Sequence, residues 1–336
     1  MLSTDGTTAA PTLRIDGLQT SFHTEAGIVR AVSGVSLEVR RGETLAIVGE
    51  SGSGKSVTGL TVMRLLGRTP ARIEAGQVLL RGRDGRMVDL LTLPEREMAQ
   101  VRGRDVAMVF QDPMSSLNPV FPVGEQIAET IRIHRRASRA AARREAVALL
   151  AQVGISDPER RVDAFPHQLS GGMRQRVMIA IALACDPLLL IADEPTTALD
   201  VTIQAQIITL LRRLQIERQM AMIFVTHDLK LVEEIADQVA VMYAGQVVEQ
   251  GPTAAVLARP RHPYTRALLD CVPHGRTAGR MQPIPGAGPN PLALPPGCRF
   301  HPRCPHATPA CVAGPPALEQ AEPERVTRCI RWREVT

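Results

Sequence analysis

Aromatic side chains are scarce in this chain of 336 residues, since Phe, Trp and Tyr together make up 3% of it. Aliphatic packing must therefore carry the core, and an apolar content of 44% is enough for a sizeable one. No long apolar run is present either: residues 177–185 form the longest, well short of the ~20 residues that a spanning helix needs. The polar first eleven residues carry no signal-peptide pattern, so we expect a cytoplasmic protein.

The net charge is mildly positive, at +5, and its densest cluster is the six arginines of residues 132–144. Such a cluster suits nucleic acid or an anionic membrane surface, but no aromatic residues alternate with it to stack on bases. We therefore interpret it as the solvated face of helices near lipid headgroups, and we expect no nucleic-acid partner. The six cysteines of a chain expected in the cytoplasm argue against structural disulfides.

Residues 49–56 follow an apolar run at 44–48, which predicts a buried strand, and precede a helical pattern at 57–66. A strand, a glycine loop and a helix are the context of a phosphate-binding loop, because backbone N–H groups and the helix N-terminus then face one anion. We expect the lysine to reach the β- and γ-phosphates and the last serine to ligate Mg²⁺. The residues expected to bind nucleotide are Gly49, Ser51, Gly52, Ser53, Gly54, Lys55 and Ser56.

Two further side chains are candidates for the same site. Phe22 precedes the loop, and an aromatic residue there can stack on an adenine ring. A short insertion at 23–27 leaves its register open, so packing within a strand is the alternative. Gln111 follows a strand predicted at 105–110, where it can touch Mg²⁺ and the attacking water.

A second anion-binding helix start lies further along the chain. Ser170 is a good N-cap, and Gly171 and Gly172 expose N–H groups at the start of an apolar helix predicted over 173–184. One nucleotide needs only one such helix start from a chain. The second therefore suggests a site that another subunit completes.

Acidic and imidazole groups follow two more predicted strands. The apolar run 188–192 ends in Asp193, expected to bind Mg²⁺, and Glu194, expected to polarise a water for in-line attack. The strand predicted at 220–225 leads to His227, expected at the γ-phosphate because an α/β nucleotide site collects its ligands at strand ends. Together with the phosphate loop, these residues predict a site where an activated water can attack a bound phosphate. The loop by itself is consistent with kinases, GTPases and many ATPases.

Four of the six cysteines lie in the last 39 residues, beyond a Pro- and Gly-rich stretch that starts near 273. Thiolates gathered in a reducing compartment fit a soft metal or an iron–sulfur cluster. Neither a two-residue zinc knuckle nor ferredoxin spacing is present, and cysteines without metal are a third alternative. The residues are Cys298, Cys304, Cys311 and Cys329.

The chain resembles the ATP-binding subunits of ABC transporters over residues 12–271. The resemblance rests on motifs that occur in the family's order: the phosphate loop, Gln111, the Leu-Ser-Gly-Gly-x-x-Gln run at 169–175, Asp193, Glu194, Asp200 and His227. The runs at 111–119 and 262–268 look like those of the oligopeptide/dipeptide importer branch. The implied α/β fold is a P-loop cassette with a RecA-like core, an antiparallel β subdomain and a helical subdomain at about 123–184. A small cysteine-rich C-terminal domain would span 272–336.

The resemblance also implies partners. Two ATP-binding subunits, expected to be different chains, would sandwich ATP between one phosphate loop and the partner's equivalent of residues 170–172. Their closure would drive two transmembrane permease subunits, fed by an extracytoplasmic substrate-binding protein, from the cytoplasmic face of the membrane. For the tail, the resemblance favours a 4Fe-4S cluster over Zn²⁺. The alternative function is a soluble ABC ATPase acting on nucleic acid or ribosomes.

Overall fold

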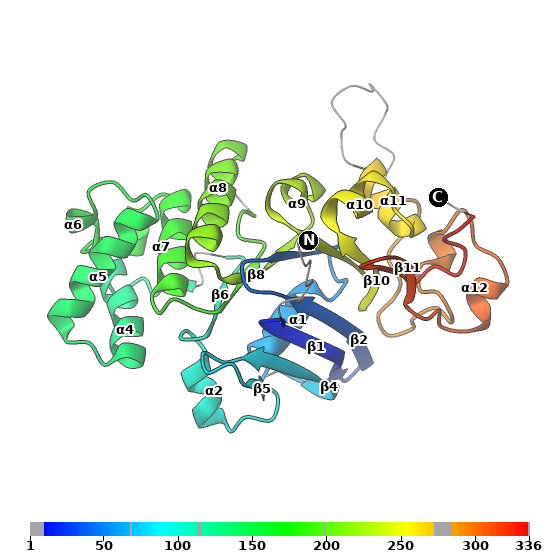
Figure 1. Cartoon of the computed structure of the whole chain (residues 1–336), viewed down its shortest axis with the longest axis horizontal. Coiled ribbons are helices and arrows are strands. Elements are labelled where there is room, and N and C mark those ends of the chain that lie inside the picture. Colours follow the sequence, from blue (N-terminus) through cyan, green and yellow to red (C-terminus); the bar gives the residue numbers. More distant parts are fainter. Residues whose placement is uncertain (1–9, 68, 113–115, 198, 272–283, 335–336) are drawn as a thin grey trace, which may run out of the picture.

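A computed structural model describes residues 10–67, 69–112, 116–197, 199–271 and 284–334 of the chain (Figure 1). Its larger sheet is eight-stranded, in the order β11-β12-β10-β9-β3-β8-β7-β6. Strands β9, β3, β8, β7 and β6 pair in parallel, so their carboxyl ends share one edge of the sheet. The bounds are β3 (Thr44–Val48), β6 (Val106–Val109), β7 (Leu189–Asp193), β8 (Ala221–Thr226), β9 (Gln238–Tyr243), β10 (Gln246–Pro252), β11 (Glu319–Glu322) and β12 (Arg325–Thr327).

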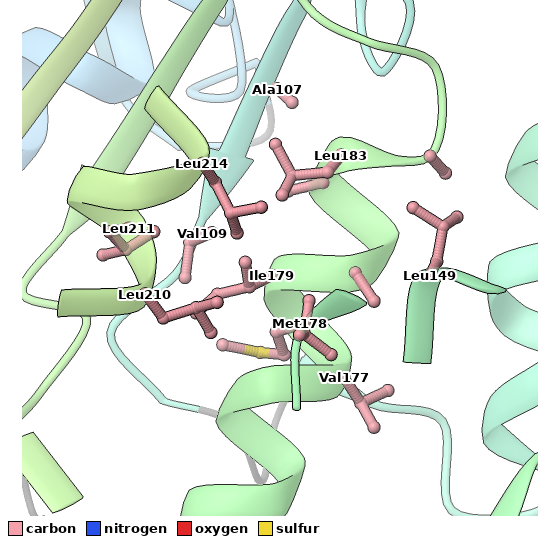
Figure 2. Close-up of a cluster of buried hydrophobic side chains, with 14 of the residues drawn as sticks. Ala107, Val109, Leu149, Val177, Met178, Ile179, Leu183, Leu210, Leu211 and Leu214 are labelled. Atoms are coloured by element: carbon pink, nitrogen blue, oxygen red, sulfur yellow. The ribbon is translucent and has the colours of Figure 1, made fainter. Parts of the chain in front are cut away.

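The central parallel strands are apolar because both of their faces are covered. Every residue of β3, β7 and β8 is buried. Successive residues of β6 enter different cores: Val109 packs with the helices, and Met108 packs with the antiparallel sheet. Figure 2 shows the first core, where side chains of α7 (Gly171–Leu183) and α8 (Val201–Arg218) gather around Val109. Aliphatic side chains therefore form this core, as the scarcity of aromatics requires.

A smaller antiparallel sheet, in the order β2-β1-β4-β5, packs on the other face. Its strands are β1 (Leu13–Thr24), β2 (Gly27–Val39), β4 (Ala71–Arg81) and β5 (Met87–Asp89). The segment 23–27 is the end of the β1–β2 hairpin rather than an insertion, because Thr24 pairs with Gly27. Phe22 consequently lies on β1, opposite Val29.

Residues 123–153, the first part of the helical subdomain expected at about 123–184, form two helices, α4 (Val123–Arg135) and α5 (Arg139–Gln152). Arg136 ends α4 in the left-handed region, with φ 52°, and Ser138 caps α5. The short α6 (Pro158–Arg161) and η1 (Pro166–Gln168) lead on to α7. Together these helices form the green lobe of Figure 1, which is the predicted helical insertion between strands.

The arginine-rich segment 132–144 is engaged in ion pairs within this lobe and with its surroundings. The pairs include Arg132–Glu125 at 2.8 Å, Arg135–Asp186 at 2.8 Å and Arg143–Asp163 at 2.6 Å. Part of the positive charge is therefore neutralised by the protein itself. Among the described residues, no helix has the length and apolar character needed to cross a membrane.

The remaining helices connect or flank the sheets. They are α1 (Lys55–Val62), α2 (Glu95–Val101), α9 (Leu229–Ile235), α10 (Thr253–Ala258), α11 (Pro263–Asp270), η2 (His301–Arg303) and α12 (Ala310–Ala313). The sequence did not predict α2. Residues 113–115, in the run 111–119, lie outside the described part of the chain, as do residues 272–283.

The C-terminal region continues the main sheet, because β12 pairs with β10 and β11 pairs with β12. It occupies the end of the molecule opposite to α4–α6 (Figure 1). The domain boundary predicted at 271/272 falls beside residues outside the description, so the division into two domains stays a prediction.

A buried ion pair fastens this region to the sheet. Glu249 of β10 and Arg325 of β12 have side chains 0% and 2% exposed, and Arg325 Nη2 lies 2.6 Å from Glu249 Oε1. The Glu249 carboxylate also accepts the backbone N–H groups of Arg261 at 2.7 Å and His262 at 3.0 Å. Arg325 also lies 3.3 Å from the Glu322 carboxylate, whereas it is the cation that compensates the buried charge of Glu249.

We expect Arg325→Met to lower the free energy of unfolding by ~3–5 kcal/mol, because it leaves the Glu249 carboxylate buried without its cation. Urea titration followed by circular dichroism measures the change. Arg143→Met is the matched control, since the Arg143–Asp163 pair is 52% and 61% exposed and its loss should cost ~1 kcal/mol or less. Equal, small losses for both variants would contradict the role given to the buried pair.

Candidate active site

The loop at 49–54 joins β3 to α1 and forms an anion cradle. Gly49, Gly52 and Gly54 have φ values of 153°, 76° and 101°, which L side chains rarely adopt. A Cβ on Gly49 would lie 2.2 Å from the Met242 carbonyl oxygen, and one on Gly54 would lie 2.3 Å from that of Ala31. Glycine is therefore required at both positions, for its conformation and for its lack of a side chain. The loop borders a cavity of about 590 Å³.

Lys55 and Ser53 in this loop are suited to a bound phosphate. Lys55 is 5% exposed, and its Nζ donates to the carbonyl oxygens of Gly49 at 2.8 Å and Glu50 at 3.0 Å. Burial lowers the pKa of this ammonium group. The buried Ser53 Oγ has no hydrogen-bond partner among the described residues. A phosphate group fits both observations, because its oxygens would accept from the hydroxyl and give the cation an anionic partner.

Ser56 of α1 and Asp193 at the end of β7 meet at the floor of the site. Ser56 Oγ donates to Asp193 Oδ1 at 2.9 Å. Burial raises the pKa of the Asp193 carboxyl, and the hydrogen bond from Ser56 opposes that shift. Hydroxyl and carboxylate oxygens are the hard ligands that Mg²⁺ takes beside nucleotide phosphates. The donor set therefore fits the Mg²⁺ expected from the sequence.

Side chains that follow three neighbouring strands meet at the Glu194 carboxylate. Its Oε2 lies 3.3 Å from Gln111 Nε2, 2.9 Å from Thr197 Oγ1 and 3.3 Å from His227 Nδ1. Gln111, Glu194 and His227 follow β6, β7 and β8, and all of them line the cavity of the phosphate loop. Glu194 has a left-handed φ of 44°, and its N–H donates to the Val225 carbonyl oxygen at 3.0 Å. Strain of this kind persists where the surrounding structure fixes it, which is common at functional sites.

Phe22 lines a second hollow, of about 420 Å³, that adjoins the phosphate loop on its other side. Val29 of β2 and Tyr243 of β9 also line it. The two hollows share residues 50–54, so a ligand whose phosphates lie in the loop has a partly apolar surface next to it. Phe22 is therefore placed where the base of a nucleotide can reach it.

Ser170, Gly171 and Gly172 start α7, as the sequence predicted. The Ser170 Oγ accepts the N–H of Met173 at 3.3 Å. None of the three lines the cavity of the phosphate loop, and Ser170 and Gly171 are exposed. The start of α1, in the phosphate loop, and the start of α7 therefore do not border the same cavity. The start of α7 is available to a ligand outside this chain's own site.

The four C-terminal cysteines line one small hollow together with His301 and His306. Burial raises the pKa of the Cys298 and Cys304 thiols, and it raises that of Cys329 to about 11. Within the part of the chain that the structure describes, no three His, Cys, Asp or Glu side chains are placed to hold a metal ion. The four cysteines predicted as metal ligands thus line one hollow, but the structure does not arrange them around a metal ion. The metal itself stays a prediction.

Three residues around the site were not predicted. Thr197 contacts Glu194, the Tyr264 hydroxyl accepts the N–H of Glu50 at 2.9 Å, and Arg303 lies 2.7 and 3.0 Å from the two Glu50 carboxylate oxygens. Tyr264 belongs to the run 262–268, which the sequence showed only as a family motif. Arg303 carries no local signal, since its partner is 253 positions away.

The fold and this site together define an ATP-binding cassette, the P-loop ATPase of ABC proteins. Residues 32–197 match the family model described as ABC transporter, and residues 248–311 match that described as oligopeptide/dipeptide transporter, C-terminal region. The chain belongs to the family of ATP-binding subunits of oligopeptide/dipeptide ABC transporters, and it is an ATPase. The family and the cassette fold expected from the sequence are confirmed.

Relatives match the chain almost from end to end. It is 53% identical to a putative peptide import ATP-binding protein of Brucella melitensis, over 97% of this chain and 98% of that protein. It is 50% identical to the dipeptide transport ATP-binding protein DppD of Escherichia coli, over 94% and 95%. Among solved structures, it is similar to the dimeric post-hydrolysis state of the cassette MJ0796 bound to ADP and Pi. That match has a TM-score of 0.63 and 27% identity, over 72% of this chain and 98% of the other.

Proposed function

We propose that this ATPase is the motor subunit of a peptide importer. It would act at the cytoplasmic face of the cell membrane on two permease subunits that receive peptides from an extracytoplasmic substrate-binding protein. The observation that carries the proposal is the similarity, C-terminal region included, to proteins named for peptide import. This similarity favours the importer over an ATPase that acts on nucleic acid or ribosomes.

Within the site, we assign Glu194 as the base or water-orienting group. Its carboxylate is fixed by Thr197 and Gln111, so it needs little rearrangement to accept a proton from the attacking water. His227, beside it, contacts the γ-phosphate, and Lys55 neutralises charge that develops on the phosphates. Mg²⁺, when held by Ser56 and Asp193 with Gln111 nearby, supplies further neutralisation of phosphate charge.

A second ATP-binding subunit, which we propose to be a different chain, completes the site. Residues 170–172 of this chain would present their N–H groups to the nucleotide held by the partner's phosphate loop. Ser170 and Gly171 are exposed, and none of the three residues lines this chain's own cavity, which supports that assignment. The similar cassette MJ0796 is dimeric in its solved structure, which supports a paired arrangement as well.

We expect Glu194→Gln to keep ATP binding and to lose ~10²-fold or more of turnover, since the amide cannot accept the proton. ATP affinity, ATP hydrolysis and uptake of a labelled peptide are measured on the complex in proteoliposomes. Glu217→Gln, on the exposed side of α8, is the control and should retain all three. Substantial hydrolysis by the Glu194 variant would overturn its assignment, whereas ATP hydrolysis by the wild type without peptide uptake would overturn the importer.

For the C-terminal region, proposed as a domain over 272–336, we propose a 4Fe-4S cluster held by Cys298, Cys304, Cys311 and Cys329. The four cysteines line one hollow, and thiolates are the ligands that a soft metal centre takes. Arg328 and Arg331 line the same hollow, and their positive charge would offset that of bound thiolates. Burial raises the pKa of the Cys298, Cys304 and Cys329 thiols, so cluster binding must release protons from them.

We expect protein purified without oxygen to contain iron and acid-labile sulfide in equal amounts, and Cys304→Ser to lose both. Cys185→Ser is the control, since Cys185 is buried beside α7 and far along the chain from the hollow. Iron, sulfide and zinc are measured on the same samples. Stoichiometric zinc without iron, or neither metal, would contradict the cluster.

A further inference from the structure

The hollow that contains Phe22 is closed on one side by the C-terminal region. Gly288, Pro289, Pro291 and Leu294 line it, across from residues of β1 and β2. These residues follow the cassette in the sequence and play no part in the catalytic arrangement around Glu194. Their position beside the phosphate loop therefore needs an explanation of its own.

We propose that residues 288–294 form the base-binding wall of this chain's own ATP site, so that the adenine ring lies between them and Phe22. The hollow of about 420 Å³ has the size of a small-molecule site. It shares residues 50–54 with the phosphate cavity, so the two hollows form the apolar end and the phosphate-binding end of one site. Pro289 and Leu294 offer apolar surface to the ring without a hydrogen-bond requirement.

Arg303 connects the segment before the wall to the phosphate loop. Arg303 makes a two-pronged ion pair with the Glu50 carboxylate, and its Nε donates to the Pro285 carbonyl oxygen at 3.0 Å. Its side chain is 6% exposed. One guanidinium thus joins the phosphate loop to the segment that leads into the wall, and we assign Arg303 as a positioning residue.

Two more residues of the C-terminal region, Leu292 in the wall and Arg299 beyond it, contact the cassette near the hollow. The Leu292 side chain approaches the β1–β2 turn so closely that a Cβ on Gly27 would lie 3.3 Å from it. Arg299 donates to the Ala244 carbonyl oxygen and, at 3.2 Å, to Ser33 Oγ. Ala244 lines the same hollow. The C-terminal region therefore contacts the β1–β2 hairpin and the turn at Ala244, both of which border the hollow.

The sequence of the wall suits this role. Prolines at 289, 291, 295 and 296 restrict the backbone before any ligand binds, so ordering the segment costs little conformational entropy. Asn290 closes a local turn, because its Oδ1 accepts the N–H of Leu292 at 3.0 Å. A preformed wall raises affinity for the base without a conformational change on binding.

Leu294→Asn tests the wall. We expect the full chain with this change to bind MgATP about five- to tenfold more weakly, because it replaces an apolar contact with a polar one. Its affinity for magnesium tripolyphosphate, which has no base, should stay within twofold of the wild type. Val312→Asn is the control: this side chain is 40% exposed and lines neither hollow, so both affinities should be unchanged. An equal loss for both ligands, or no loss for MgATP, would contradict the proposal.

Cross-linking with 8-azido-ATP tests the wall on the wild-type chain, so the result does not depend on whether a variant folds. We expect mass spectrometry of the wild-type chain to find the label on residues 288–294 as well as on the β1–β2 hairpin. Label on the hairpin alone would contradict the wall while leaving the ATP site itself intact. Absence of any label within the cassette would instead contradict the assignment of the nucleotide site.

Discussion

Parallel pairing of β6, β7, β8 and β3 is the constraint on which the site depends. It brings Gln111, Glu194, His227 and the phosphate loop to one edge of the sheet, although they lie far apart in the sequence. The pairing is stable because buried aliphatic side chains cover both faces of these strands. The left-handed Glu194 then follows from its position: its backbone N–H is bound to Val225 on the neighbouring strand, and its carboxylate turns toward Gln111 and His227. The packing of the core thus stabilises the strand pairing that positions the catalytic side chains.

The C-terminal region adds a second constraint, since ion pairs of two of its arginines attach it to the cassette. At one point, Arg325 neutralises Glu249 inside the sheet; at the other, Arg303 binds Glu50 in the phosphate loop. Cys304, which lines the hollow of the cysteines, directly follows Arg303 in the chain. The guanidinium of Arg303 in turn pairs with Glu50 of the phosphate loop.

The sequence predicted the parts of this protein that local patterns encode. The phosphate loop was recognisable because glycine is required at defined positions, and Ser170 because a helix cap needs a short polar side chain ahead of an apolar run. Buried strands were recognisable because they are apolar throughout. The ends of helices were less predictable: the division of 123–153 at Arg136 depends on a left-handed residue that carries no glycine signal. Contacts such as Arg303–Glu50 or Tyr264–Glu50 were not predictable at all, because they depend on the folded topology and not on neighbours in the chain.

The central claim is that this chain contributes one half of an ATP site and that residues 170–172 serve the partner's nucleotide. The most direct measurement compares Ser170→Arg with the wild type, as ATP affinity of the isolated chain and as ATP turnover of the assembled transporter. The account predicts unchanged affinity, because Ser170 does not line this chain's own cavity, and a large loss of turnover in the complex. Full turnover, or an equal loss of ATP affinity in the isolated chain, would contradict it.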